Sequence, residues 1–207
     1  MEIVSSDESG QNVTKLNNGE GVKARDFAIY RPDNLLYWTS YNDTIQVARL
    51  TPDGRGTMLG SIQTQADIKP DQISISSQKG QIVFTNKQCA GFNSNHCELI
   101  FKANMDGSDR CTILTGTPAV SSLTVEEKTD ELSVYWNDAG KIRRTSVGDA
   151  CQGPHGVGEE IKESTALSMG VINQKIYWIE QSNKEMMPMY VSRTNRDRNH
   201  RDRNFSR

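Results

Sequence analysis

The feature that most constrains this chain is a pair of bulky apolar residues that recurs at similar spacing. The four pairs are Tyr37-Trp38, Val83-Phe84, Tyr135-Trp136 and Tyr177-Trp178. Successive pairs lie 46, 52 and 42 residues apart. A period of about 40–50 residues is typical of β-propellers, in which each repeat forms one blade of four short strands. A β-sandwich with ordinary core strands does not account for this spacing.

The residues around each pair predict the four strands. Alternating apolar residues and a polar turn lead up to the pair, as in FAIYRPDNLLYW and ISISSQKGQIVF, and a third alternating stretch follows, as in TIQVARL and ELIFKANM. Two of the third stretches end in a hairpin signal, Asp53-Gly54 and Asp106-Gly107, because glycine accepts a positive φ. The segments GTMLGSI and CTILTG supply fourth strands. The fold class predicted is all-β, a β-propeller of four-stranded antiparallel blades.

The repeat also predicts the domain organisation. We expect a partial propeller over residues 1–192, whose units cover approximately 1–20, 22–66, 68–117, 119–163 and 165–192 onward. The first unit resembles only the third and fourth strands of a blade. Residues 193–207 hold six Arg and two Asp, and we expect a basic tail or a degenerate last strand there, more typical of a solvated end than of a polyanion site.

The paired rings have a physical role in this architecture. Consecutive residues of a strand point to opposite faces, so each pair supplies one large side chain to each face of its sheet. Aromatic rings that bury about 150–250 Å² each can hold successive sheets together without a thick central core.

The repeated residues resemble the YWTD (class B) repeats of the low-density lipoprotein receptor family. The four tetrapeptides are Tyr37-Trp38-Thr39-Ser40, Val83-Phe84-Thr85-Asn86, Tyr135-Trp136-Asn137-Asp138 and Tyr177-Trp178-Ile179-Glu180. The runs that lead from Ile45 to Asp53-Gly54 and from Ile100 to Asp106-Gly107 match the supporting pattern of the family. The resemblance implies a six-bladed extracellular propeller that binds protein ligands on one face and is neighboured by EGF-like modules.

Two departures from the family pattern matter. The aspartate at the fourth position survives only as Asp138, with Glu180 as a conservative neighbour, so the hydrogen bonds made there are in question at Ser40 and Asn86. About four and a half units do not close a six-bladed ring. We therefore expect a fragment of a longer chain, or a divergent gene product that lacks its partner segment.

The four cysteines predict disulfides. Cys89 and Cys97 bracket seven residues on one connection, which suits a local bridge, and Cys111 would then pair with Cys151. Four cysteines allow three connectivities, and the sequence does not choose among them. A zinc site would need Cys89, His96, Cys97 and Cys111, but there is no CxxC or HxxxH spacing to favour it.

Three sequons predict glycosylation, at Asn12, Asn42 and Asn204. No window holds the roughly 18 apolar residues that span a bilayer, so we expect membrane attachment only through a transmembrane segment absent from these residues. The expected location is extracellular or at the cell surface, or endosomal, as an ectodomain fragment.

The ligand-binding face is predicted at the connections between second and third strands. These connections contain Tyr41, Phe92, His96 and Lys184, and exposed aromatic residues are frequent binding anchors. Covering the blade edges is an alternative role for them. A glycan on Asn42 would crowd this part of the surface.

The predicted function is that of a non-catalytic protein-binding module of an endocytic or signalling receptor, without a cofactor, a metal or nucleic acid. No GxSxG, HExxH or P-loop motif is present. The alternatives are a nidogen-like matrix component, the ectodomain of a receptor tyrosine kinase, and a calcium-dependent propeller hydrolase. The hydrolase would use inward acids such as Asp26, Asp71 and Glu126.

Overall fold

The computed structural model of the chain describes residues 3–16, 23–87, 98–116, 120–129, 131–148, 158–164, 166–172, 174–180 and 191–194. These residues form antiparallel sheets, with one short 3-10 helix, η1 (Arg31–Asp33). No helix within these ranges is long and apolar enough to cross a membrane.

The strands follow one another in sequence within each sheet. A hairpin, β1 (Val4–Ser5) and β2 (Thr14–Lys15), comes first. Sheet I contains β3 (Ala24–Tyr30), β4 (Leu35–Ser40), β5 (Thr44–Leu50) and β6 (Gly56–Gln63). Sheet II contains β7 (Pro70–Ser76), β8 (Gln81–Asn86), β9 (Glu98–Asn104) and β10 (Cys111–Thr115). Sheet III contains β11 (Val120–Glu127), β12 (Leu132–Asp138), β13 (Lys141–Val147) and β14 (Glu159–Glu163). Sheet IV contains β15 (Ala166–Ile172), β16 (Lys175–Glu180) and β17 (Val191–Thr194).

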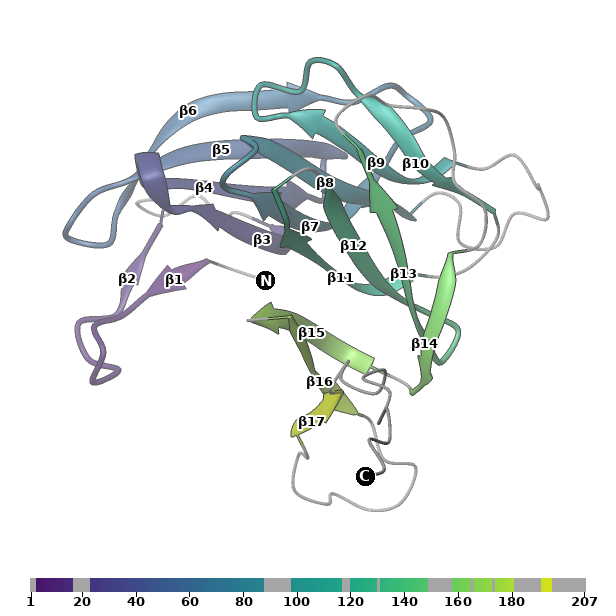
Figure 1. The fold of residues 1–207 in the computed structure, drawn as a ribbon. Coiled ribbons are helices and arrows are strands. Elements are labelled where there is room, and N and C mark those ends of the chain that lie inside the picture. The colour runs from purple at the N-terminus through teal and green to yellow at the C-terminus, as the bar shows by residue number, and fades with distance from the viewer. Residues whose placement is uncertain are drawn as a thin grey trace, which may run out of the picture.

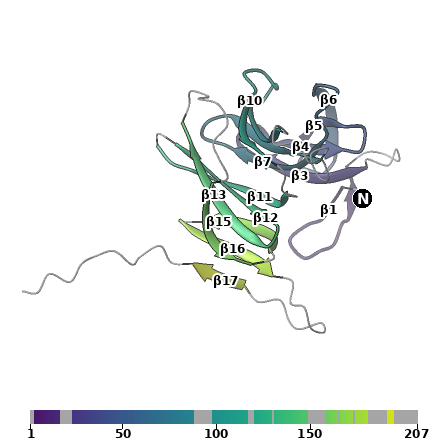
Figure 2. The same cartoon turned by 90° about the vertical axis from the view of Figure 1, so that its right-hand side faces the viewer.

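Successive sheets pack face to face along an arc. The first strand of each sheet contacts the first strand of the next, so β3, β7, β11 and β15 form the inner row, and β6, β10 and β14 lie at the periphery (Figure 1). Seen from the side, sheets III and IV continue the arc below sheets I and II (Figure 2). The arc is open in the described residues, with β1–β2 at one end and sheet IV at the other. The predicted fold class, an incomplete β-propeller, is confirmed.

The cores lie between the sheets, and the paired rings fill them. Trp38 of β4 packs with Leu36 and Ala48 on one face of sheet I. Tyr37 packs on the other face, against Ile82 and Phe84 of sheet II. The remaining pairs divide in the same way: Val83 and Trp136 share the core between sheets II and III, whereas Tyr135 and Trp178 share the core between sheets III and IV.

The turn between the third and fourth strands recurs with the same hydrogen bonds. In β5–β6, Thr51 N–H donates to Arg55 O at 2.8 Å and Gly54 N–H donates to Thr51 O at 2.9 Å. The β9–β10 turn repeats both bonds, from Asn104 to Ser108 O and from Gly107 to Asn104 O. The glycines have φ of 78° and 87°, a left-handed conformation that disfavours other residues.

The β1–β2 hairpin has this turn too. Asp7 N–H donates to Gln11 O, and Gly10 N–H, at φ 76°, donates to Asp7 O, both at 3.0 Å. Its Leu16 packs with Ala48 and Trp38 on the face of sheet I that points away from sheet II. The hairpin therefore has the turn and the place of the third and fourth strands of a preceding sheet.

Candidate ligand-binding face

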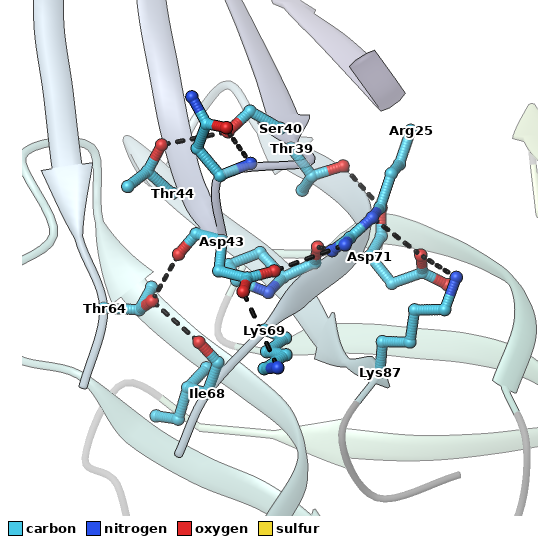
Figure 3. Close-up of polar contacts among 12 residues, drawn as sticks. Arg25, Thr39, Ser40, Asp43, Thr44, Thr64, Ile68, Lys69, Asp71 and Lys87 are labelled. Carbon is cyan, nitrogen blue, oxygen red and sulfur yellow. Dashed lines mark hydrogen bonds and ion pairs between the residues drawn. The ribbon is translucent and has the colours of Figure 1, made fainter. Parts of the chain in front are cut away.

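In the described residues, two connections between second and third strands lie beside connections between sheets, since Thr64 Oγ1 donates to Asp43 O and Ser164 N–H donates to Gly140 O. The β4–β5 connection holds Tyr41, Asn42 and Asp43, and the link from β6 to β7 runs beside it. The Thr64 hydroxyl joins the two, because it is 2.9 Å both from Asp43 O and from Ile68 O. Figure 3 shows Asp43, Thr64 and Ile68 together with Asp71 of β7 and with Lys87, which follows β8.

The β4–β5 connection is held by hydroxyl groups. Ser40 Oγ accepts a hydrogen bond from Asn42 N–H at 3.2 Å and lies 3.0 Å from Thr44 Oγ1. Asp43 N–H donates to Ser40 O, and Asp43 has φ 59°, a left-handed conformation that aspartate tolerates better than most residues. This short turn presents Tyr41 with its side chain half exposed.

Arg25 joins sheet I to sheet II beneath Tyr41. The pairing of β3 with β4 skips Arg25, and such a bulge redirects a side chain. Its Nη1 donates to Pro70 O at 2.9 Å and its Nη2 donates to Asp43 Oδ1 at 3.2 Å. The guanidinium lies 4.9 Å from the centre of the Tyr41 ring, within range of a cation–π interaction.

Two lysines complete the charge pattern. Lys69 Nζ lies 3.8 Å from Asp43 Oδ2, and Lys87 Nζ lies 3.9 Å from Asp71 Oδ1, which is also 4.0 Å from Arg25 Nε. Three cations thus share two carboxylates. Both lysine side chains are exposed, and ion pairs of this kind contribute at most about 1 kcal/mol. Their ammonium groups can therefore turn to an anionic group of a ligand at little cost.

In sheets II and IV, the side chain at the fourth position of the tetrapeptide forms hydrogen bonds with the segment that leads into the sheet. In sheet II, Asn86 Oδ1 accepts from Lys69 N–H at 2.9 Å and Nδ2 donates to Asp67 O at 3.1 Å. In sheet IV, Glu180 Oε1 accepts from Ser164 Oγ at 3.1 Å. Among the described residues, the Ser40 side chain bonds only within its own turn, and Asp138 forms an ion pair with Arg143 at 3.2 Å. The side chain at this position therefore forms a hydrogen bond or an ion pair in all four sheets, although it is an aspartate only in sheet III.

The acids considered for a calcium-dependent enzyme have other partners. Asp26 Oδ2 accepts from Ile73 N–H of sheet II at 2.8 Å, and burial raises the pKa of this carboxyl above its usual value. Glu126 Oε2 accepts from Tyr135 OH at 2.8 Å. Asp71 forms the ion pairs with Arg25 and Lys87. Within the described ranges, no three His, Cys, Asp or Glu side chains are grouped to hold a metal ion.

The predicted site residues differ in burial and in whether the structure describes them. The sequon residues Asn12 and Asn42 are exposed, and Tyr41 lies on the face described above. The members of the four pairs are buried, except that Tyr177 is partly buried. Those that lie outside the described residues are Cys89, Phe92, His96, Cys97, Cys151, Lys184 and Asn204. Cys111 is disulfide-bonded, and its partner also lies outside the described residues.

Sequence reasoning missed the cations of this face and considered Asp71 only as an acid of a hydrolase. Arg25, Lys69 and Lys87 are separated by up to 62 positions and belong to no motif. Only the packing of sheet I against sheet II brings them together, so the sequence held no signal for them.

Comparisons with known proteins agree with the propeller. No protein-family model matches the chain. The low-density lipoprotein receptor-related protein 5 of Mus musculus is 27% identical over 165 residues, covering 79% of this chain and 9% of that receptor. The Homo sapiens protein of the same name is 25% identical over 190 residues, covering 90% of this chain and 11% of the receptor. The chain spans about a tenth of the length of these relatives.

A solved structure shares the fold. The crystal structure of a nidogen/laminin complex aligns with a TM-score of 0.51 at 16% sequence identity, covering 85% of this chain and 78% of that one. The resemblance found in the repeats, to the YWTD propellers of the low-density lipoprotein receptor family, is thus confirmed by sequence similarity to a receptor-related protein and by the fold.

Proposed function

We propose that the chain is a non-catalytic, extracellular protein-binding propeller, which belongs to an endocytic or signalling receptor and is flanked there by EGF-like modules. The similarity to a lipoprotein receptor-related protein supports the receptor assignment. The similar nidogen structure contains a protein partner, laminin, which supports protein binding. The pairing of Asp26, Asp71 and Glu126 with protein groups supports a role without catalysis.

The observation that carries this proposal is the exposed Tyr41 ring on the Arg25 guanidinium. Tyrosine and arginine are enriched at the centres of protein interfaces. Here Arg25 is held by Asp43 and by Pro70 O, so the ring is supported before any ligand binds. The exposed lysines beside it favour a partner with an acidic rim.

The test uses the full chain and two variants, Tyr41→Ser and Leu59→Ser. Both positions are about half exposed, but Leu59 lies on the peripheral strand β6, away from the β4–β5 connection. Secreted proteins cross-linked to each variant would be identified by mass spectrometry. We expect at least one partner that binds the parent and the Leu59→Ser chain but is lost with Tyr41→Ser. If every partner is retained by the Tyr41→Ser chain, the binding face is wrong.

A second experiment tests the extracellular location. Expressed in the secretory pathway of mammalian cells, the chain should carry glycans at Asn12 and Asn42, because both side chains are exposed. Removal by an N-glycosidase should increase mobility on a gel, and the Asn12→Gln and Asn42→Gln variants should each lose one glycan. A chain that reaches the medium unmodified would contradict this expectation.

A further inference from the structure

The ion pairs of the candidate ligand-binding face form a row of five alternating charges. Lys69 lies at one end of the row, beside Asp43, and Lys87 lies at the other end, beside Asp71. Arg25 stands in the middle and contacts both carboxylates (Figure 3). The row therefore ends on a lysine at each side, and each lysine has one carboxylate partner among the described residues.

The two halves of this row are not equivalent. Asp43 Oδ1 accepts a hydrogen bond from Arg25 Nη2 at 3.2 Å, so this carboxylate is already bonded to the guanidinium. Asp71 Oδ1 lies 4.0 Å from Arg25 Nε and 3.9 Å from Lys87 Nζ, and both distances are longer than a hydrogen bond. Asp71 is therefore shared between two cations and is hydrogen-bonded to neither of them.

This sharing leaves a buried donor unsatisfied. Arg25 Nε is buried, and within the part of the chain that the structure describes it has no hydrogen-bond partner. A buried N–H group without an acceptor destabilises a fold. Asp71 Oδ1 reaches hydrogen-bond distance if it comes about 1 Å closer to Arg25 Nε. Only the side chain has to move, because Asp71 O is held by the Thr39 hydroxyl.

Lys87 competes with Arg25 for this carboxylate. Its side chain is 56% exposed, whereas that of Arg25 is 12% exposed, so an anionic group of a ligand can reach Lys87 directly. Once Lys87 turns to the ligand, Asp71 is free to accept from Arg25 Nε, and the hydrogen bond gained offsets the ion pair lost. Lys69 offers no such exchange, because its partner Asp43 is already hydrogen-bonded to Arg25.

The charges around Lys87 favour a protein carboxylate over a polyanion. Polyanions such as nucleic acids gain affinity from each cation that they neutralise. Here Asp43 and Asp71 interrupt the cations, and the whole chain has a net charge of −2. A single aspartate or glutamate side chain needs only one ammonium group. Tyr41 lies on the same guanidinium, so an apolar side chain next to the acid has a ring to pack on.

We propose that Lys87 recognises an aspartate or glutamate side chain of the protein partner, and that binding transfers Asp71 from Lys87 to Arg25. This inference rests on the proposed function, because it names the chemistry that the same face recognises. Arg25 Nε is then satisfied only in the bound chain. The exchange therefore favours a segment that carries the acid over one that does not.

The test follows the Arg25 Nε–H signal of the isotope-labelled full chain by nuclear magnetic resonance. An Arg25→Lys chain identifies the signal by its loss. The probe is a peptide of sequence Phe-Gly-Glu-Gly with both ends blocked, and Phe-Gly-Gln-Gly is its control. We expect the glutamate peptide to move the signal to the position of a hydrogen-bonded N–H, and the glutamine peptide to leave it in place.

Lys87→Gln and Lys69→Gln form a matched pair, because each removes one exposed ammonium group from an end of the row. In the Lys87→Gln chain, the Arg25 signal should be moved before any peptide is added, since Asp71 is released. This chain should bind the glutamate peptide about tenfold more weakly than the parent. The Lys69→Gln chain should bind it within about twofold of the parent. The backbone signals of the same spectra show that each variant is folded.

An Arg25 signal that does not respond to the glutamate peptide would overturn the inference, and so would equal losses of affinity in the two lysine variants. A heparin hexasaccharide that moves the signal where the peptide does not would show a polyanion site instead. Partner loss in the Tyr41→Ser chain, together with an unmoved Arg25 signal, would refute the exchange and keep the binding face. A moved signal, together with full retention of partners by Tyr41→Ser, would refute the binding face while the exchange at Lys87 stands.

Discussion

The second residue of each pair is used for its volume and not for hydrogen bonding. The indole N–H groups of Trp38, Trp136 and Trp178 are buried, and none has a hydrogen-bond partner among the residues that the structure describes. Phe84, at the equivalent place in sheet II, has no such group and stacks on Phe101 at 5.2 Å. A large ring at this position is therefore sufficient.

The first prediction follows from Trp136, which is fully buried between sheets II and III. Trp136→Ala should lower the free energy of unfolding by about 3–5 kcal/mol, because it leaves a cavity. Trp136→Phe should cost much less, since it removes an unsatisfied donor along with some volume. Urea denaturation measures both. Similar losses for the two variants would mean that the indole makes a specific contact.

A second prediction at this scale concerns Asp26. Because burial raises the pKa of this carboxyl in the folded chain, its ionised form is disfavoured there. Its contribution to stability is thus greatest below the unfolded pKa and is lost as pH rises through the folded pKa. Asp26→Asn keeps an acceptor for Ile73 N–H, so it should stabilise the chain at pH 7, by an amount that shrinks toward pH 4. Melting temperatures across this range test it, and a gain that does not depend on pH would contradict it.

At the scale of the elements, β-bulges in the first strands provide contacts between neighbouring sheets. The first strand of every sheet skips one or two residues in its pairing with the second strand, and the skipped residues include Arg25, Asp71 and Ser121. Arg25 reaches Pro70 O, and Ser121 Oγ lies 3.3 Å from Ala166 O of sheet IV. The bulges at Arg25 and Ser121 therefore turn side chains toward the next sheet.

Asn86 gives the prediction at the scale of elements. Asn86→Ala leaves Lys69 N–H and Asp67 O without this partner, and we expect a loss of about 1–3 kcal/mol in unfolding free energy. Ser40→Ala is the matched control, because Ser40 stands at the same position in sheet I but bonds only within its own turn. Equal losses for both variants would argue against a role of Asn86 in joining the sheets.

Local patterns predicted the strands well, because alternation and turn residues act over a few neighbours and the repeat shows the same pattern four times. Asp53-Gly54 and Asp106-Gly107 lie in the expected turns, and η1 with Asn34 at φ 53° forms the polar turn expected before Tyr37-Trp38. The bulges could not be predicted, because the residues skipped share no type. The charged partners of Tyr41 could not be predicted either, because they depend on which sheets become neighbours.

At the scale of the whole molecule, we expect a covalent link between two sheets to add to their packing. Cys111 lies on β10 opposite Lys102, whose Nζ reaches Gly148 O next to β13 of sheet III. Cys151 follows Gly148 by three residues. The proposed Cys111–Cys151 bridge would thus tie sheet II to sheet III where a hydrogen bond already joins them.

The corresponding prediction is that peptide mapping without reduction links Cys111 to Cys151 and Cys89 to Cys97. Breaking the first bridge in a Cys111→Ser, Cys151→Ser chain should cost about 3–4 kcal/mol, as expected for a loop of this length. Calorimetry of the parent and the double variant measures the loss. Cys111 joined to either of the other two cysteines would show that the bridge does not connect these sheets.

The hydrogen bonds of Asn86 to the loop before β7 allow the side chains of that loop to vary among relatives of this protein. It binds main-chain atoms of Asp67 and Lys69, which every amino acid carries at those places. Side chains of that loop can be exchanged without loosening the scaffold, so the surface offered to other molecules is free to diversify while the architecture stays constant.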